Sequence, residues 1–355
     1  MSSDFYLESD IEEIAGFMGE EVHAIAGKTL LMSGGCGFLG RYFTRLILYL
    51  NENVLAKPCR LIVLDNFITS DARAASEHNA ESYTFIEHDI VTPIVVDEPV
   101  DYIIHAAGIA SPYYYRKYPL KTLEVATTGT KNLLELAKDK KVQSFLFFSS
   151  SEIYGNPDAV HVPTPESYRG YVSSLGPRAC YDESKRLGET LSRIYHEEYG
   201  VPTKIVRPFN AYGPGMQQFD YRVLPNFADR IVNGKPLQIY GDGSQTRTFC
   251  YITDGINGFF RTLLMGSPGE AYNVGNGSPE VSMLVLAKTL EEALERKLDI
   301  VTLEYPDAYP PDEPMRRCPD LTKSRVQLSY TPQVGLVDGL RRYFNWALAS
   351  YTKTD

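Results

Sequence analysis

A tyrosine and a lysine four residues apart, Tyr181 and Lys185, are the pair in this sequence best suited to acid–base chemistry. The segment around them, CYDESKRLGETL, has helical periodicity, so both side chains project from the same face of a helix. A phenol with its usual pKa of about 10 is a poor base at neutral pH, but an ammonium group beside it favours the phenolate. We therefore predict that the pair removes a proton from a substrate hydroxyl.

Three serines, Ser149-Ser150-Ser151, follow the apolar run FLFF and precede this helix. An apolar run of this length predicts a buried strand, which places the serine hydroxyls at the carboxyl edge of a parallel sheet. Ligands bind along that edge in open α/β sheets. The order of strand, serines and helix therefore favours an active site over a solvated helix pair, the alternative for an isolated Tyr and Lys.

A glycine-rich turn, SGGCGFLG, follows the first apolar run and contains Gly34, Gly37 and Gly40 with GxxGxxG spacing. Glycines at these places let the backbone turn sharply and approach a pyrophosphate, whose charge lies at the N-terminus of the next helix. Such a cluster alone is a weak signal. Its position between an apolar strand and an apolar helix predicts a dinucleotide site.

Asp65 indicates which dinucleotide the sequence favours, because it ends the second apolar run, about 25 residues beyond the glycines. A carboxylate there accepts hydrogen bonds from the adenosine ribose and repels a 2′-phosphate. Asn66 and Phe67 follow and offer no compensating arginine, so NAD is predicted rather than NADP. Asp89 and Ile90 end the third run and are predicted to border the adenine, although Asp89 fits a solvated strand end equally well.

Between Lys28 and Pro208, short apolar runs alternate with helical stretches. Strands that alternate with helices predict a doubly wound parallel sheet covered on both faces, which is a Rossmann fold of the α/β class. The expected strands are TLLMS, RLIVLD, YTFIEHD, DYIIHAA, FLFFSSS and TKIVRP. We assign residues 28–209 to an NAD-binding domain that includes the Tyr-Lys helix.

The sequence pattern changes on both sides of this domain. Residues 210–355 contain turns rich in Gly and Pro, such as YGPG and YPPDEP, which predict a smaller, mixed α/β C-terminal lobe for the substrate. The chain is free to cross back between the two lobes. Residues 1–27 carry helix-compatible acidic sequence that the sheet does not need, and we expect a solvated or oligomer-contacting extension.

Composition argues against several classes of function. The chain has 45 acidic and 35 basic residues, and its formal charge of -10 opposes attraction to nucleic acid or an anionic membrane. No run approaches the roughly 18 to 20 apolar residues that span a bilayer, and the first residues do not resemble an export signal. The five cysteines are scattered without CxxC spacing, so we expect no disulfide framework, no metal site and a reducing, cytoplasmic location.

With these motifs in place, the chain resembles the extended short-chain dehydrogenases/reductases, the NAD-dependent epimerase/dehydratase family that acts on nucleotide sugars. The similarity runs from about Lys28 to the C-terminus. Within the family it is greatest to the UDP-glucuronate decarboxylases, or UDP-xylose synthases. The resemblance is carried by LDNFITS, HDI, ASPYYYRKYPLKT, SSSEIYGNP, PESYRGYVSSLGPRACYDESKR, RPFNAYGPGM, YGDGSQTRTF and DEPMRRCPDLTKS.

The resemblance implies catalytic roles for five residues. Tyr181 takes the proton from the sugar 4-hydroxyl, and Lys185 assists it and holds the nicotinamide ribose. Ser150 stands where the family has a Ser or Thr that contacts the 4-hydroxyl. Glu152 matches a glutamate of the decarboxylases and the 4,6-dehydratases, and Arg317 matches an arginine that lies at the reacting sugar in the decarboxylases.

The resemblance also implies the wider contacts and a homodimer. Two helices of each subunit, around residues 119–139 and 180–198, are expected to form a four-helix contact. The expected cofactor contacts are Gly34, Gly37, Phe38, Leu39, Gly40, Asp65, Asn66, Asp89, Ile90, Ala107, Tyr181 and Lys185. The expected substrate contacts are Ser151, Tyr115, Arg317 and three residues where the family binds the nucleotide diphosphate, Asn210, Arg222 and Arg247.

The residue before Glu152 helps to choose among the reactions of the family. A 4,6-dehydratase has an acid there to protonate the departing 6-hydroxyl, whereas this chain has Ser151. A decarboxylase needs no dedicated base at C5, because a 4-keto group receives the electrons that the departing CO₂ leaves behind. We favour decarboxylation of UDP-glucuronate to UDP-xylose. The alternatives are a nucleotide-sugar 4-epimerase, a 4,6-dehydratase and, more remotely, a non-catalytic NAD(H) sensor.

The chain departs from the decarboxylase pattern around the substrate. Ala126 replaces a usual Asn, and Arg169 replaces a characteristic Trp. Ser173-Ser174 replaces Asn-Pro, and Tyr113-Tyr114 replaces Pro-Asn. These changes leave room for a different acidic sugar or another end point, with the hydride chemistry retained.

Overall fold

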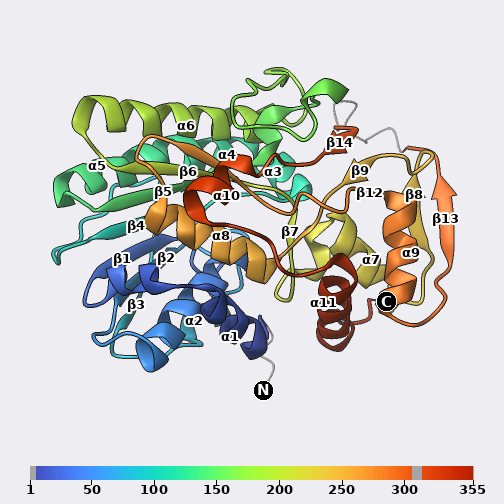
Figure 1. The fold of residues 1–355 in the computed structure, drawn as a ribbon, viewed down its shortest axis with the longest axis horizontal. Helices are drawn as coiled ribbons and strands as arrows, with labels where there is room; N and C mark the ends of the chain where they lie inside the picture. The colour runs from blue at the N-terminus through green and yellow to red at the C-terminus, as the bar shows by residue number, and fades with distance from the viewer. Residues whose placement is uncertain (1–4, 306–313, 355) are drawn as a thin grey trace.

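The computed structural model describes residues 5–305 and 314–354, and its centre is a seven-stranded parallel sheet (Figure 1). The strands are β1 (Thr29–Ser33), β2 (Arg60–Asp65), β3 (Tyr83–Glu87), β4 (Tyr102–His105), β5 (Ser144–Phe148), β6 (Thr203–Pro208) and β11 (Ala271–Val274). Their order is β3-β2-β1-β4-β5-β6-β11, so the winding reverses between β1 and β4. Ligands of doubly wound sheets bind beside such a reversal, and the predicted Rossmann fold is confirmed.

Helices cover both faces of this sheet (Figure 1). One face carries α1 (Glu8–Phe17), α2 (Phe38–Asn53) and α8 (Ile252–Met265), and the other carries α4 (Pro119–Glu124), α5 (Thr130–Lys140) and α6 (Ala179–Tyr199). Side chains alternate across a strand, so Leu30 and Met32 of β1 enter the first core and Leu31 enters the second. This burial on both sides explains why β1 is apolar along most of its length.

The structure confirms the six strands expected from the sequence. Strands β1, β2 and β6 begin and end with the predicted runs, whereas β3, β4 and β5 end two or three residues before the predicted runs do. Ser149, Asp89 and Ala107 therefore lie in loops just beyond the sheet. The seventh strand, β11, is not among the predicted ones, because its four residues precede glycine-rich turns.

The smaller lobe is built mainly from residues after β6. It contains a small three-stranded sheet, a pair of parallel strands and three helices, on the right of Figure 1. The sheet is β12 (Val281–Ser282), β9 (Thr246–Arg247) and β14 (Arg316–Arg317); the pair is β8 (Leu237–Tyr240) and β13 (Ile300–Leu303); the helices are α7 (Val223–Val232), α9 (Met283–Ala293) and α11 (Leu336–Ser350). Between segments of this lobe, the chain returns to the central sheet and forms α8 and β11 there.

The chain crosses between the lobes through shorter elements. Strands β7 (Ala211–Tyr212) and β10 (Cys250–Tyr251) form a parallel pair. The helix α10 (Thr322–Leu328) packs on α8 and β11. These contacts hold the segment that follows Arg317 against the central sheet.

Residues 5–27 pack against the core and do not form a solvated extension, whereas the other expectation, an oligomer contact, stays a prediction. Helix α1 packs on α2 and α8, and the side chain of Asp10 is fully buried. Its carboxylate accepts hydrogen bonds from the hydroxyls of Tyr42 at 3.3 Å and Tyr251 at 2.9 Å. Arg342 of α11 donates to Glu13 at 2.8 Å. The segment is thus part of the core and joins the first residues to the last helix.

The five cysteines are free thiols, and four of them are buried. Burial raises the pKa of the Cys36 and Cys59 thiols to about 12, which makes them poor nucleophiles. In the described parts of the chain, no helix combines the length and apolar character needed to cross a bilayer.

Candidate active site

The glycine-rich turn between β1 and α2 fits close packing of backbone on backbone. Gly34 has a φ of +76°, and a Cβ there would lie 2.6 Å from the backbone nitrogen of Ala107. A Cβ on Gly40 would overlap the carbonyl oxygen of Gly34. Gly37 is the residue directly before α2, so the N-terminus of that 16-residue helix opens at the turn. The turn thus presents backbone N–H groups and a positive helix end to an anion.

A cleft opens beside this turn at the carboxyl ends of the strands. Seven of the expected cofactor residues line it: Gly34, Gly37, Asp65, Asn66, Asp89, Ile90 and Ala107. Phe38 and Leu39 begin α2, and their side chains pack against the core instead. Gly108 and Ile109 also line the cleft and are not among the residues expected from the sequence. They follow Ala107 directly in the loop after β4, and this position is the feature of the sequence that could have identified them.

The carboxylate of Asp65 is held in a fixed position in this cleft. One oxygen accepts from the backbone N–H of Cys36 at 3.0 Å, and the other accepts from Phe67 N–H at 2.9 Å and Ser70 Oγ at 2.7 Å. The cleft fits NAD, because it combines this carboxylate with the close glycine turn and the start of α2. Asp89 is less available, since it accepts from Lys121 Nζ at 2.9 Å.

Tyr181 and Lys185 lie on one face of α6, as predicted, and both are buried. Lys185 Nζ donates to the carbonyl oxygen of Phe148 at 2.7 Å and lies 5.8 Å from the centre of the Tyr181 ring. The Tyr181 side chain is hydrogen-bonded to that of Ser150. Lys185 Nζ also lies next to Gly108, so it reaches the cofactor cleft. The pair therefore connects the cleft with the serines after β5.

Burial changes the ionisation of this pair in a way that the sequence does not indicate. Burial lowers the pKa of Lys185 to about 8. It also raises the pKa of Tyr181, against the opposing effects of the Ser150 hydrogen bond and the positive charges of Arg222 and Arg178. Desolvation of the phenolate thus opposes the effect expected of the ammonium group.

Tyr115 extends the aromatic wall beside Tyr181. It lies on α3 (Pro112–Lys117), is almost completely buried, and stacks on the Tyr181 ring with a centroid distance of 5.3 Å and an angle of 15°. Tyr113 on the same helix packs against Tyr221, with a centroid distance of 4.7 Å and a tilt of 37° between the rings. The side chains of Tyr113 and Tyr114, which differ from the decarboxylase pattern, therefore lie between α3 and the start of the smaller lobe.

Glu152 lies between two arginines at the other end of the serines. It belongs to the short 3₁₀ turn Ser151–Tyr154, in which the Ser151 side chain is buried. Arg317 donates from both Nη atoms to the two carboxylate oxygens, with the Nη2–Oε2 bond at 2.8 Å. Arg178, which the sequence analysis does not name, pairs with the same carboxylate and lies 3.6 Å from Asp182. Its place three residues before Tyr181 is the only sequence signal for it.

The three expected diphosphate contacts each bond to a different group of the protein. Arg222 pairs with Asp220 at 2.7 Å and lies close enough to influence Tyr181. Arg247 is the partner of Arg317 in the small sheet and donates to the carbonyl oxygen of Pro314 at 2.6 Å. Asn210 donates to the carbonyl oxygen of Thr248 at 2.8 Å. Their roles toward a diphosphate stay predictions.

The family model of the NAD dependent epimerase/dehydratase family matches residues 30–275, which contain the glycine turn, Asp65, the serines and the Tyr-Lys helix. The chain belongs to this family. The resemblance inferred from the sequence is thereby confirmed. The cofactor of the family is NAD, which agrees with the geometry of the cleft.

Individual relatives and solved structures agree with this membership. UDP-glucuronic acid decarboxylase 5 of Arabidopsis thaliana is 38% identical over 312 residues, which cover 88% of this chain and 86% of the relative. A dTDP-glucose 4,6-dehydratase from Streptomyces venezuelae, solved with NAD, has a TM-score of 0.76 at 28% identity and covers 90% of this chain and 96% of its own. A UDP-glucuronic acid 4-epimerase from Bacillus cereus, solved with UDP-glucuronic acid and NAD, has a TM-score of 0.75 at 26% identity, with coverages of 91% and 100%.

Proposed function

We propose that this family member decarboxylates UDP-glucuronate to UDP-xylose. The observation that carries the proposal is the position of the Glu152 carboxylate between the guanidinium groups of Arg178 and Arg317. Both arginines are buried, and the cluster adjoins the Ser150–Tyr181 pair. The 38% identity to a UDP-glucuronic acid decarboxylase over most of both chains supports the same reaction.

The residues around Tyr181 suit removal of a proton from the sugar 4-hydroxyl. Ser150 and Tyr181 share a hydrogen bond, so a hydroxyl placed between them can pass its proton to the tyrosine. The cleft beside Gly34 and Asp65 would hold NAD, which would supply reversible hydride transfer at C4. Lys185 lies between the phenol ring of Tyr181 and the cofactor cleft. From there it can contact both the phenol and the bound cofactor.

The arginines suit a sugar that carries a carboxylate at C5. Two guanidinium groups share one glutamate, and Asp182 lies beside Arg178, so Arg178 has a second carboxylate and Arg317 has Glu152. The two parallel bonds from Arg317 to Glu152 are the geometry that an arginine offers to any carboxylate. We infer that the sugar carboxylate takes the place of Glu152 at Arg317 while Arg178 retains the glutamate.

Loss of CO₂ then needs no further catalytic base. A C5 carboxylate beside a C4 ketone is a β-keto acid, and the ketone accepts the electron pair of the broken carbon–carbon bond. Positive charge near the ketone stabilises the enolate that forms. The residue before Glu152 is Ser151, which does not supply the acid that a 4,6-dehydratase uses at this place.

A second candidate reaction is C4 epimerisation of UDP-glucuronate. The observation that favours it is the likeness to a UDP-glucuronic acid 4-epimerase over 91% of this chain. Both reactions begin with oxidation at C4 of the same substrate. They differ in whether the carboxylate is still present in the product.

The experiment that separates these reactions follows the mass of the products. Purified protein with NAD is incubated with UDP-glucuronate, UDP-glucose and dTDP-glucose, and the products are measured by mass spectrometry. Loss of the mass of CO₂ from UDP-glucuronate, without net NADH, is expected. A product of unchanged mass that is a C4 epimer contradicts the proposal, as does loss of water from a neutral sugar. Tyr181→Phe serves as the inactive control.

We also infer a homodimer that acts in the cytoplasm. Four apolar side chains on the outer faces of α4 and α6 are exposed and support a helix-to-helix contact: Leu120, Leu123, Leu187 and Ile194. The free thiols support a reducing compartment. Sedimentation equilibrium at micromolar concentration tests the dimer. Leu120→Glu/Leu187→Glu is expected to give monomers, and a monomeric unmodified protein rejects the inference.

A further inference from the structure

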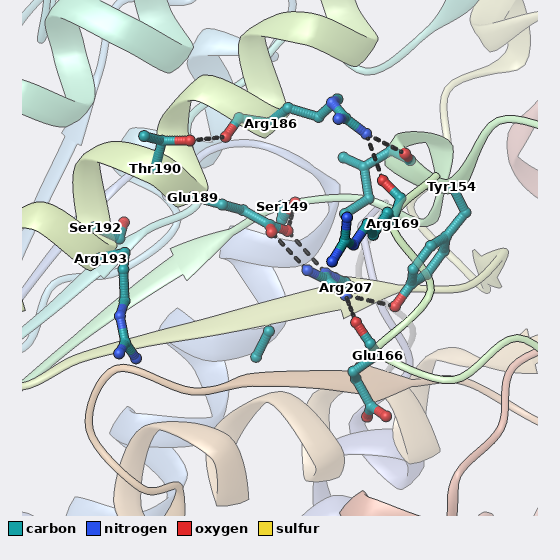
Figure 2. Close-up of polar contacts among 12 residues, drawn as sticks. Ser149, Tyr154, Glu166, Arg169, Arg186, Glu189, Thr190, Ser192, Arg193 and Arg207 are labelled. Atoms are coloured by element: carbon teal, nitrogen blue, oxygen red, sulfur yellow. Dashed lines mark hydrogen bonds and ion pairs between the residues drawn. The ribbon is translucent and has the colours of Figure 1, made fainter. Parts of the chain in front are cut away.

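A buried hydrogen-bond network lies behind the catalytic serines, with Arg207 of β6 at its centre (Figure 2). Arg207 donates to both carboxylate oxygens of Glu189, at 2.9 Å from Nε and 2.7 Å from Nη2. Its Nη1 donates to the Tyr154 hydroxyl at 2.7 Å and to the carbonyl oxygen of Glu166 at 2.9 Å. Four hydrogen bonds thus leave this guanidinium a single orientation.

The network fixes the Tyr-Lys helix to the end of β5. Glu189 follows Lys185 by one helical turn and lies on the same face of α6. Its carboxylate accepts from Ser149 Oγ at 2.5 Å, while Lys185 donates to the carbonyl oxygen of the preceding residue, Phe148. Two successive residues of β5 and its loop are therefore tied to two successive turns of α6. These bonds hold the residues just before Ser150 against the helix that carries Tyr181.

The same network reaches the segments that carry Glu152 and Arg317. Tyr154 ends the 3₁₀ turn that contains Glu152, and its hydroxyl donates to Asn273 Oδ1 at 2.8 Å. The amide of Asn273 donates to the carbonyl oxygen of Asp320 at 3.1 Å. Thr164 also donates its backbone N–H to Cys318 at 2.8 Å. Arg207 is thus linked to the loop that follows Arg317.

We propose that Arg207 is a positioning residue that sets the geometry between the Ser150–Tyr181 pair and the Glu152–Arg317 pair. It acts through Glu189 and Tyr154, each of which it binds directly. The proposal rests on the proposed function only in that the reaction starts by oxidation at C4. A small displacement of reacting groups can slow an enzyme by about 10²-fold, so the network matters for rate more than for binding.

Energetics favour this role over simple stabilisation. The Arg207 and Glu189 side chains are 11% and 15% exposed, so the pair has lost most of its hydration. Buried ion pairs often stabilise a fold no more than apolar side chains of similar volume do. The four hydrogen bonds of Arg207 are better explained by the single arrangement that they impose on the segments they join.

The chain offers a matched control pair away from the site. Arg261 of α8 pairs with Glu21 at 3.0 Å, and these side chains are 12% and 16% exposed. Arg261 also donates to Asn257, to the carbonyl oxygen of Leu328 and to that of Phe17. Its burial and bonding resemble those of Arg207, but it joins α8 to the N-terminal segment.

The test compares Arg207→Met and Arg207→Lys with Arg261→Met and Arg261→Lys in the NAD-loaded enzyme, with activity expressed per folded protein. We expect both Arg207 variants to lose about 10- to 100-fold in kcat with KM for UDP-glucuronate and Kd for NAD nearly unchanged. The Arg261 variants should lower Tm by a similar amount while kcat stays within about twofold, because stability alone does not set the chemical step. Equal kcat losses at the two arginines overturn the proposal.

Two further measurements keep the proposal testable. Arg207→Ala should regain part of its kcat when millimolar guanidinium is added, whereas Arg261→Ala should not. If Arg207→Met does not fold, Glu189→Gln is the substitute, and normal turnover by that variant overturns the proposal. Absence of CO₂ release by the unmodified enzyme rejects decarboxylation instead. The same variants are then compared on whichever nucleotide sugar the enzyme oxidises at C4.

Discussion

Arg317 and Glu152 are separated by 165 residues in the chain, yet they form a two-bond ion pair at the sugar end of the site. The pair joins β14 of the small sheet to the turn after β5 of the central sheet. The smaller lobe and the Rossmann domain therefore meet at the place where the sugar is expected to react.

Replacing Arg317 tests its role toward the sugar carboxylate. Arg317→Ala should lower kcat on UDP-glucuronate by at least about tenfold, because a group that neutralises the carboxylate and the developing enolate is lost. Arg316→Ala is the control, since Arg316 pairs with Glu280 at 2.6 Å instead. Near-normal CO₂ release by Arg317→Ala would remove this arginine from the mechanism.

Tyr181→Phe tests the acid–base group. The variant should fold and bind NAD while losing about 10² to 10⁴ in rate, the usual contribution of a positioned acid–base group. Tyr195→Phe on the same helix is the control, because its hydroxyl bonds to Glu135 away from the serines. Single-turnover formation of NADH and CO₂ is measured for both variants. A Tyr181→Phe enzyme with a near-normal rate would require a different base.

Because Lys185 is buried, kcat/KM of the enzyme should fall at alkaline pH. Burial lowers the pKa of Lys185 to about 8, so its ammonium loses the proton as pH rises through that value. We expect kcat/KM to fall above this pH, since the positive charge beside Tyr181 and the cofactor is lost. Lys185→Arg retains the charge and should move this fall to higher pH. An unchanged fall in that variant assigns the titration to another group.

Asp65 should determine the choice of cofactor. Its carboxylate faces the cleft and repels a 2′-phosphate, so NADP is expected to bind at least about tenfold more weakly than NAD. Asp65→Ser combined with Asn66→Arg should reduce this ratio. Fluorescence titration with both cofactors measures it. Asp65→Ser alone reports the separate effect of losing the bonds to Cys36 and Ser70.

The buried Asp10 should make stability depend on pH. Burial raises the pKa of Asp10 to about 6, above its value of 3.8 in an unfolded chain, so the folded state prefers the protonated form. Its contribution to stability is therefore full below pH 3.8 and is lost as pH rises through about 6. We expect Asp10→Asn to gain in Tm relative to the unmodified enzyme between pH 5 and pH 7.5. A constant difference would show that Asp10 does not titrate there.

The sequence predicts those parts of the fold that rest on local patterns. Strands buried on both faces must be apolar runs, and turns between them need glycine or polar residues, so six strands and the glycine turn are recognisable. Tyr181 and Lys185 are four residues apart, and helical geometry alone brings them together. The strand β11 is not predicted, because a run of only four residues before glycine-rich turns does not show the length or periodicity of a strand.

Long-range pairing explains what the sequence does not indicate. Arg178 is ordinary in sequence and becomes part of the site only because Glu152 lies beside it in the fold. Arg207 follows an apolar run and gains its partners from α6 and from the turn after β5. The N-terminal helix is buried only because α2 and α8 provide its surroundings. Such contacts are set by the tertiary structure, which no spacing rule contains.

The position of β11 has a consequence for synthesis on the ribosome. The sheet ends at β6 until Ala271–Val274 has emerged, although β6 carries Arg207 and lies next to β5. An incomplete chain therefore presents the unpaired backbone groups of β6 as an open edge, which other nascent chains can join. Helix α8 leaves the ribosome just before β11 and covers one face of the same region. A holdase chaperone would therefore have most to shield before α8 emerges, when both the edge of β6 and this face of the sheet are open.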